Sequence, residues 1–122
     1  MKKKLIYVVD DDPEIRDLLA SALELEDFNV VNISNGINLI EELKKKKPDL
    51  ILLDIMMSWI DGFDICNSIK QNQLYKDIPI IFITAYKNNK IESEIKQSLA
   101  DDYIFKPFSL NDLLTMIKKH IK

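Results

Sequence analysis

The chain has 122 residues, with 17 Lys and Arg against 20 Asp and Glu, a formal net charge of −3 and 47% hydrophobic residues. This length and composition predict one folded domain over residues 1–122 rather than a disordered chain. The acidic balance, without a basic stripe, argues against nucleic-acid binding by this chain alone. No apolar run approaches the ~18 residues of a membrane span, and the one cysteine has no partner for an internal disulfide. We therefore expect no membrane segment and a cytoplasmic location.

The first third of the chain predicts a strand, a helix and a second strand. Residues 5–9 are a short apolar run rich in β-forming side chains, which is typical of a buried strand. Asp12 followed by Pro13 is typical of an N-cap and a first-turn proline, and apolar residues recur at helical spacing as far as Leu23. Residues 28–33 predict the second strand.

The middle of the chain repeats this alternation. Asn35 begins a second helix, and Pro48 ends it after a run of lysines that suits a helix C-terminus. The side chains of this helix that we expect to face inward are Leu39, Ile40 and Leu43. Residues 50–53 predict a third strand, with Asp54 at its end. A helix follows Asp61-Gly62, and its expected inward residues are Phe63, Cys66 and Ile69.

The last third predicts two more strands and two more helices. Residues 80–83 form a strand that ends at Thr84, and a more polar helix lies between Asn88 and Ser98. Residues 103–105 form a short fifth strand that ends at Lys106. Ser109 and Asp112 resemble a capping box. The apolar stripe of the last helix is then Leu110, Leu113, Leu114, Ile117 and Ile121.

Five strand–helix units in alternation predict an α/β fold, with a parallel sheet covered by helices on both faces. The strands are apolar throughout rather than at every second residue, which agrees with burial on both sides. In such sheets the ligand site lies at the carboxyl ends of the strands.

Polar residues collect at those strand ends. Asp10 and Asp11 follow the first strand, Asp54 the third, Thr84 the fourth and Lys106 the fifth. Each has an ordinary explanation by itself, such as a solvated turn or a surface charge. Their occurrence together at one edge of one sheet favours a shared function.

Phosphoryl transfer gives one reason for the whole set. Three carboxylates repel one another, and Mg²⁺, which prefers oxygen ligands and phosphate oxygens, relieves that repulsion. Asp54 would then serve both as a metal ligand and as the nucleophile that forms an acyl phosphate. Lys106 supplies a second cation, and the Thr84 hydroxyl can donate a hydrogen bond to a phosphoryl oxygen.

Over its whole length the sequence resembles the response-regulator receiver domains of two-component signalling systems. The segments that carry the resemblance are Val8-Val9-Asp10-Asp11-Asp12-Pro13, Pro48-Asp49-Leu50-Ile51-Leu52-Leu53-Asp54, Asp61-Gly62-Phe63, Ile83-Thr84-Ala85 and Asp101-Asp102-Tyr103-Ile104-Phe105-Lys106-Pro107-Phe108. The resemblance implies a flavodoxin-like, doubly wound sheet of order 2-1-3-4-5 with five helices, the order that is general for this class.

The resemblance also implies roles for individual residues. Asp54 is the expected phosphoacceptor. Asp10, Asp11, Asp54 and the backbone carbonyl of Met56 are the expected Mg²⁺ ligands. Thr84 is the expected switch hydroxyl, Lys106 the phosphoryl-stabilising lysine and Tyr103 the switch aromatic.

The resemblance further implies partners and an output. The phosphodonor is a sensor histidine kinase, a histidine phosphotransfer protein or a small phosphodonor. The output is an attached domain or a homodimer, controlled through residues 84–122. The implied domain is a phosphoacceptor that assists its own phosphorylation and dephosphorylation, not an enzyme acting on other substrates.

Two positions depart from the family pattern. Ser58 stands where the family usually has a proline, which predicts a looser loop. Leu99 stands where a glycine is usual, and leucine is costly if that position needs a positive φ. The alternative is that the preceding helix ends differently, which makes the helix between Asn88 and Ser98 the least secure element.

Three further residues have ordinary interpretations. Cys66 is expected to be a core thiol, and His120 a solvated cation or helix-end partner. Trp59 is the one tryptophan and falls in the acceptor loop. Covering the loop, shielding the site and meeting a partner remain open for it.

Three other functions are alternatives to that of a phosphoacceptor. A haloacid-dehalogenase-type phosphatase would use Asp10 as the nucleophile, but the chain is short for that fold. A flavodoxin needs a hydroxyl-rich phosphate loop where this chain has acidic residues. A degenerate, phosphate-independent receiver is disfavoured by the intact set of Asp10, Asp11, Asp54, Thr84 and Lys106.

Overall fold

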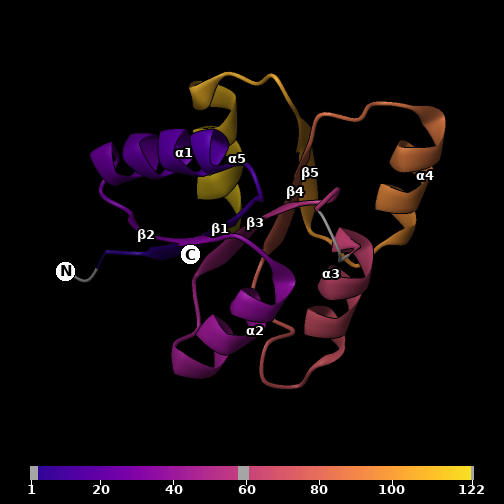
Figure 1. Cartoon of the computed structure of the whole chain (residues 1–122), viewed down its shortest axis with the longest axis horizontal. Helices are drawn as coiled ribbons and strands as arrows, with labels where there is room; N and C mark the ends of the chain where they lie inside the picture. Colours follow the sequence, from indigo (N-terminus) through magenta and orange to yellow (C-terminus); the bar gives the residue numbers. More distant parts are fainter. Residues whose placement is uncertain (1–2, 58–60, 122) are drawn as a thin grey trace.

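The computed structural model describes residues 3–57 and 61–121. Along the chain, strands and helices alternate strictly (Figure 1). The strands are β1 (Leu5–Val9), β2 (Asn29–Ile33), β3 (Leu50–Asp54), β4 (Ile80–Thr84) and β5 (Asp102–Phe105). The helices are α1 (Pro13–Leu25), α2 (Gly36–Lys45), α3 (Gly62–Gln71), α4 (Asn89–Gln97) and α5 (Leu110–His120).

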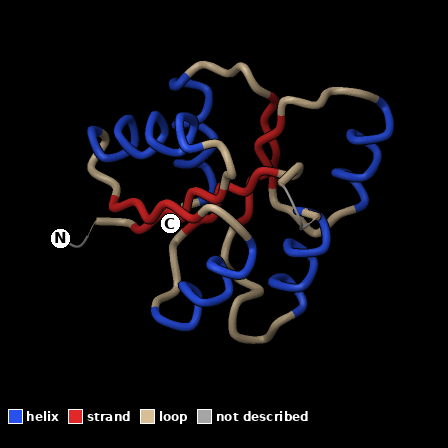
Figure 2. The backbone as a smooth tube through the Cα atoms, viewed as in Figure 1, coloured by secondary structure: helices blue, strands red, loops and turns tan. Residues whose placement is uncertain are grey.

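The five strands form one parallel sheet in the order β2-β1-β3-β4-β5. This confirms the predicted class, order and number of helices. Figure 2 shows the strands as a twisted layer between helices. The second strand is shorter than predicted, since it begins at Asn29 and not at Phe28, whose side chain is nevertheless buried.

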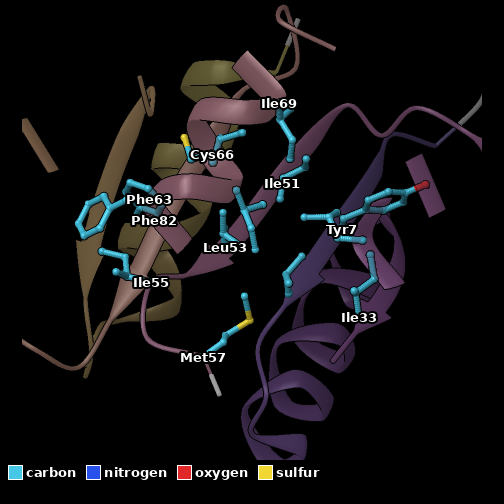
Figure 3. Packing of buried hydrophobic residues seen from close by; sticks show 14 of the residues in the cluster. Tyr7, Ile33, Ile51, Leu53, Ile55, Met57, Phe63, Cys66, Ile69 and Phe82 are labelled. Carbon is cyan, nitrogen blue, oxygen red and sulfur yellow. The ribbon is translucent and has the colours of Figure 1, made fainter. Parts of the chain in front are cut away.

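Helices cover both faces of the sheet. On one face, α1 and α5 pack on Ile6, Val8, Leu52 and Ile83. On the other, α2, α3 and α4 pack on Tyr7, Leu53 and Phe82 (Figure 3). Alternate residues of each central strand therefore belong to two cores. This is why these strands are apolar throughout.

Each helix begins on a side chain that caps its first turn. Asp12, Asn35, Asp61, Asn88 and Ser109 each accept a hydrogen bond from a backbone N–H of the helix that follows. Such caps are worth about 0.5–2 kcal/mol each. The caps therefore help to fix where each helix starts.

The predicted inward positions of Ile40 and Leu110 are wrong, and one further apolar residue at helical spacing is also exposed. Ile40 is 42% exposed, Leu110 is 42% exposed, and Leu18, at helical spacing in α1, is 67% exposed. Leu39 and Leu43 already fill the α2 stripe, and Leu19 and Leu23 that of α1. A stripe one residue wider than the contact surface leaves its edge in solvent.

The least secure helix is present as α4, and Leu99 is compatible with it. The helix ends at Gln97, its C-cap Ser98 has a φ of −78°, and the one described non-glycine residue with a positive φ is Asp27. The backbone N–H of Leu99 donates to Asn67 Oδ1 of α3 at 3.1 Å. The helix therefore ends by a different route, as the alternative interpretation predicted. Ser58 and Trp59 lie outside the described residues.

Candidate functional site

Parallel pairing places Asp10 and Asp54 side by side. Val9 of β1 pairs with Leu53 of β3, so the residue after each partner lies at the same level at the carboxyl edge of the sheet. Carboxylate oxygens of Asp10, Asp11 and Asp54 lie within 4.8 Å of one another. Asp10 and Asp54 are buried, whereas Asp11 is exposed. The structure thus brings together the three acidic residues singled out in the sequence.

The Asp10 carboxylate is held on both of its oxygens. Oδ1 accepts a hydrogen bond from the backbone N–H of Asp12 at 3.0 Å, and Oδ2 accepts one from Lys106 Nζ at 2.8 Å. Its backbone carbonyl accepts from the Arg16 guanidinium at 2.9 Å. Asp10 is therefore a fixed, charge-compensated group.

Lys106 reaches across the sheet from the end of β5. Its backbone N–H donates to the Thr84 carbonyl at 2.8 Å, which fixes the start of the side chain beside β4. Its ammonium forms the ion pair with Asp10 and lies 3.9 Å from Asp54 Oδ2. One lysine thus faces both buried carboxylates.

Asp54 is the less compensated of the two buried carboxylates. Its Oδ1 accepts from the backbone N–H of Met56 at 3.3 Å. Burial, followed by the negative charge of Asp10, raises the pKa of Asp54 to about 7, against the opposing effects of Lys106 and the Met56 N–H. The site therefore disfavours a second buried negative charge on Asp54. A further cation would lower the pKa of Asp54 and favour its ionised form.

The donor set fits a hard divalent cation. Three carboxylates offer oxygen ligands from two adjacent loops, and one of them is exposed to solvent. Mg²⁺ is commonly bound by one or two carboxylates together with waters and phosphate oxygens. The Met56 backbone lies beside Asp54, as its N–H contact shows. The role of its carbonyl as a ligand stays a prediction.

Thr84 is fully buried at the end of β4. Its Oγ1 accepts a hydrogen bond from the backbone N–H of Tyr86 at 3.1 Å, so the loop after the strand folds back onto the hydroxyl. Asp54 pairs with Ile83 in the register between β3 and β4, and Ile83 lies one residue before Thr84. The hydroxyl therefore belongs to the same edge as the carboxylates.

Tyr103 lies on β5, away from the acidic cluster. It is partly buried and packs edge-to-face on Phe105, with ring centroids 5.6 Å apart and planes at 74°. The structure thus places it on the α4 side of the sheet, on the strand that Lys106 follows. Its role as a switch stays a prediction.

Gly62 lies beside the site, and the sequence alone does not reveal why a glycine is needed there. A Cβ there would lie 2.7 Å from Ile55 Cα and 2.9 Å from the carbonyl oxygen of Asp54. These are backbone atoms at the end of β3. The first turn of α3 therefore approaches the Asp54 backbone closely, and only a glycine permits it.

Arg16 was also missed as a site residue, although it lies on the first turn of α1. The signal was a single arginine in an otherwise apolar and acidic stretch just after the acidic pair. Its contact with the Asp10 carbonyl fixes the β1–α1 connection.

Cys66 and His120 follow their ordinary interpretations. Cys66 is fully buried, and burial raises the pKa of its thiol to about 12, so it remains protonated near neutral pH. His120 Nε2 lies 2.9 Å from Asp102 Oδ2, which joins the end of α5 to the start of β5. Trp59 lies outside the described residues.

Comparisons with known proteins bear on this site. The family model of the response regulator receiver domain matches residues 6–118. The chain is 38% identical over 120 residues to the phosphate regulon transcriptional regulatory protein PhoB of Pseudomonas aeruginosa, covering 97% of this chain and 52% of that protein. It is 35% identical over 115 residues to the DNA-binding dual master transcriptional regulator RpaA of a Synechocystis species, covering 93% of this chain and 47% of that protein.

A solved structure agrees with these relatives. The response regulator TrrA of Thermotoga maritima, in complex with Mg²⁺ and BeF, has a TM-score of 0.86 and 34% identity, covering 97% of this chain and 99% of that one. The chain spans about half the length of the curated relatives it matches. Among the residues that the structure describes, no helix is long and apolar enough to cross a membrane. A match to the family model over nearly the whole chain, on a fold with the expected strand order, shows that this chain belongs to the response-regulator receiver domains of two-component systems.

Proposed function

We propose that this receiver domain takes a phosphoryl group onto Asp54, with Mg²⁺ held by Asp10, Asp11, Asp54 and the Met56 carbonyl. The observation that carries the proposal is the convergence of three carboxylates within 4.8 Å, with one lysine facing the two that are buried. The donor is a histidine kinase, a histidine phosphotransfer protein or a small phosphodonor.

Asp54 suits the nucleophile better than Asp10 does. Both Asp10 oxygens accept hydrogen bonds of 3.0 Å or shorter. The backbone hydrogen bond to Asp54 Oδ1 is longer, at 3.3 Å, and Asp54 Oδ2 lies 3.9 Å from the lysine, so these contacts hold Asp54 less tightly. This difference supports Asp54 over the phosphatase alternative, which would make Asp10 the nucleophile.

The chemistry is an in-line displacement at phosphorus. An Asp54 oxygen forms a bond to phosphorus while the bond from phosphorus to the donor nitrogen or oxygen breaks, and the leaving group takes a proton from solvent. Mg²⁺, when bound by these residues, would supply positive charge to the transferring oxygens and favour the ionised form of Asp54. Lys106 supplies charge on the other side, and the Thr84 hydroxyl can donate to a phosphoryl oxygen.

The conformational response follows from Thr84. A phosphoryl group on Asp54 offers new acceptor oxygens that can draw the Thr84 side chain inward. Space would open beside β4, and Tyr103 could turn toward it. The surface of residues 84–122 would then change and control an attached output domain or a homodimer. Phosphorylation biases this equilibrium only through its different interaction with the two states.

The edge of the site also offers a place for a donor protein to approach. Ile15, the exposed Leu18 and Phe108 line a groove of about 340 Å³ that is bounded by Lys106. An exposed apolar groove at the edge of a charged site is typical of a surface that another protein covers. It supports a protein phosphodonor. A cytoplasmic location stays the expectation for this domain.

Labelling with acetyl phosphate tests the proposal. Wild-type protein with Mg²⁺ should gain one phosphoryl group, and Asp54→Asn should gain none. Asp77→Asn, at an exposed loop position away from the site, is the matched control and should label like the wild type. Equal labelling of Asp54→Asn and wild type would exclude Asp54 as the acceptor.

A further inference from the structure

A surface lysine lies over the aromatic pair of β5. Lys87 Nζ is 5.4 Å from the centroid of the Phe105 ring, within the range of a cation–π contact. Phe105 in turn packs edge-to-face against Tyr103 at 5.6 Å. Lys87 comes from the loop between β4 and α4, so this contact joins that loop to the strand that carries Tyr103.

The loop that carries Lys87 is short and fixed at both ends. Residues 85–87 connect Thr84, the last residue of β4, to Asn88, the N-cap of α4. The Tyr86 N–H donates to Thr84 Oγ1 at 3.1 Å, and Asn88 Oδ1 accepts from the Ile91 N–H at 2.9 Å. Lys87 therefore lies one residue from a backbone group bound to the Thr84 hydroxyl, and its backbone follows Thr84 if that side chain moves.

Phe105 is tied to Thr84 from the other side. The two residues are partners in the β4–β5 register, and the Lys106 N–H donates to the Thr84 carbonyl at 2.8 Å. The strand backbones are thus locked together, and the Lys87 side chain joins the loop to the Phe105 ring. A shift of the loop relative to β5 would change the distance between Lys87 Nζ and the Phe105 ring.

We infer that Lys87 is a positioning residue that couples Thr84 to the Tyr103 face by holding the Phe105 ring. This inference rests on the proposed function. When Thr84 is drawn toward a phosphoryl group on Asp54, Tyr86 and Lys87 move with it, and the ammonium leaves the ring. Phe105 and Tyr103 then gain freedom to rearrange together. While the contact holds, it favours the aromatic arrangement seen here.

Loss of this contact is expected to change the populations of the two arrangements only modestly. Lys87 is exposed, and a cation–π contact at an exposed site changes a population ratio by roughly two- to five-fold. Loss of the contact should move the free protein toward the beryllofluoride-bound arrangement by that factor. A solvated lysine without this role would change nothing on removal.

Amide NMR shifts of residues 102–105, recorded with Mg²⁺ and with or without beryllofluoride, test the inference. Lys87→Gln should shift these signals in the free protein along the line toward their beryllofluoride-bound positions. Lys87→Arg keeps a cation that can lie over the ring and should stay near the wild type. Lys90→Gln removes the same charge on the first turn of α4, where no aromatic contact is found among residues 3–57 and 61–121, and should also stay near the wild type.

A double variant separates the ring from the charge. In a Phe105→Leu background the aromatic face is gone, so adding Lys87→Gln should produce no further shift. If Lys87→Gln matches wild type or Lys90→Gln, or moves the signals away from the bound positions, the inference is wrong. If beryllofluoride leaves residues 102–105 of the wild type unchanged, the proposed switch itself fails, which is a different result.

Discussion

The Lys106 ammonium lies 2.8 Å from Asp10 Oδ2 but 3.9 Å from Asp54 Oδ2. The lysine therefore neutralises the carboxylate that we assign to metal binding more directly than the one that we assign to phosphate. Burial and the negative charge of Asp10 disfavour the ionised form of Asp54, and they raise its pKa to about 7. The Lys106 ammonium now pairs with Asp10, and it lies close enough to Asp54 to turn toward a phosphoryl group bound there.

Replacing Lys106 should destabilise the fold when no divalent ion is bound. Asp10 is fully buried, and Lys106→Met would leave its Oδ2 without a cation. Removing one partner of a buried pair costs roughly 3 kcal/mol. Urea unfolding in the presence of a chelator should show a lower free energy of unfolding, and Lys106→Arg should recover most of it. An unchanged unfolding midpoint in Lys106→Met would mean that the ion pair has no such role.

Stability without metal should fall as pH rises. The pKa of Asp54 is raised from its ordinary value of 3.8 to about 7, so between these values the folded protein holds a proton that the unfolded chain has released. Unfolding then releases a proton, and the free energy of unfolding falls with rising pH by at most ~1.4 kcal/mol per unit. The stability that the protonated carboxyl contributes is complete below about pH 4 and lost above about pH 7.

Urea unfolding at several pH values, with a chelator present, measures this dependence. Asp54→Asn removes the titrating group and should flatten the curve over the same window, whereas Asp77→Asn should keep the wild-type slope. A slope in Asp54→Asn equal to that of the wild type would assign the dependence to another group.

Mg²⁺ should stabilise the folded protein. Binding to the folded state adds RT ln(1 + [L]/Kd), on the order of 1 kcal/mol when the ion is several-fold above Kd. Asp11→Asn should weaken the response, because it removes the exposed carboxylate of the cluster. Melting temperatures across an Mg²⁺ titration give the measurement, and the fluorescence of Trp59 gives a second signal. The metal site is wrong if Mg²⁺ alters neither the melting temperature nor phosphorylation.

Gly62→Ala should damage both stability and phosphorylation. The added Cβ would press on the Ile55 and Asp54 backbones, which can yield only by moving α3 or the end of β3. Overpacking of this kind costs about 1–3 kcal/mol. The melting temperature and the rate of acetyl phosphate labelling should both fall. Ser68→Ala, at an exposed position of α3, controls for the change of residue type, and an equal effect of the two substitutions would exclude the steric explanation.

The alternation of strands and helices and the edge where the site lies could be predicted because each depends on local pattern, whereas the strand order was implied by the resemblance to receiver domains. Apolar runs at residues 5–9 and 50–53 carry their own burial signal, and Asp12, Asn35 and Ser109 mark helix starts through backbone capping. Once β1 and β3 are parallel neighbours, the residues that follow them lie side by side. The convergence of Asp10 with Asp54 follows from that register.

The remaining features depend on contacts that local pattern does not encode. Leu18 and Ile40 look like core residues by spacing, but the helix stripes are already filled by their neighbours. The need for Gly62 comes from the approach of α3 to the backbone of β3, and its φ is not positive. The preference of Lys106 for Asp10 over Asp54 is a matter of about an ångström, which no sequence pattern records.

The most direct test is to locate the phosphoryl group chemically. Borohydride reduces an aspartyl phosphate to homoserine, so the protein is treated with acetyl phosphate and Mg²⁺, reduced, digested and sequenced by mass spectrometry. Our account predicts homoserine at position 54 and aspartate at positions 10 and 11. Homoserine at Asp10 or Asp11, with Asp54 unmodified, would contradict it.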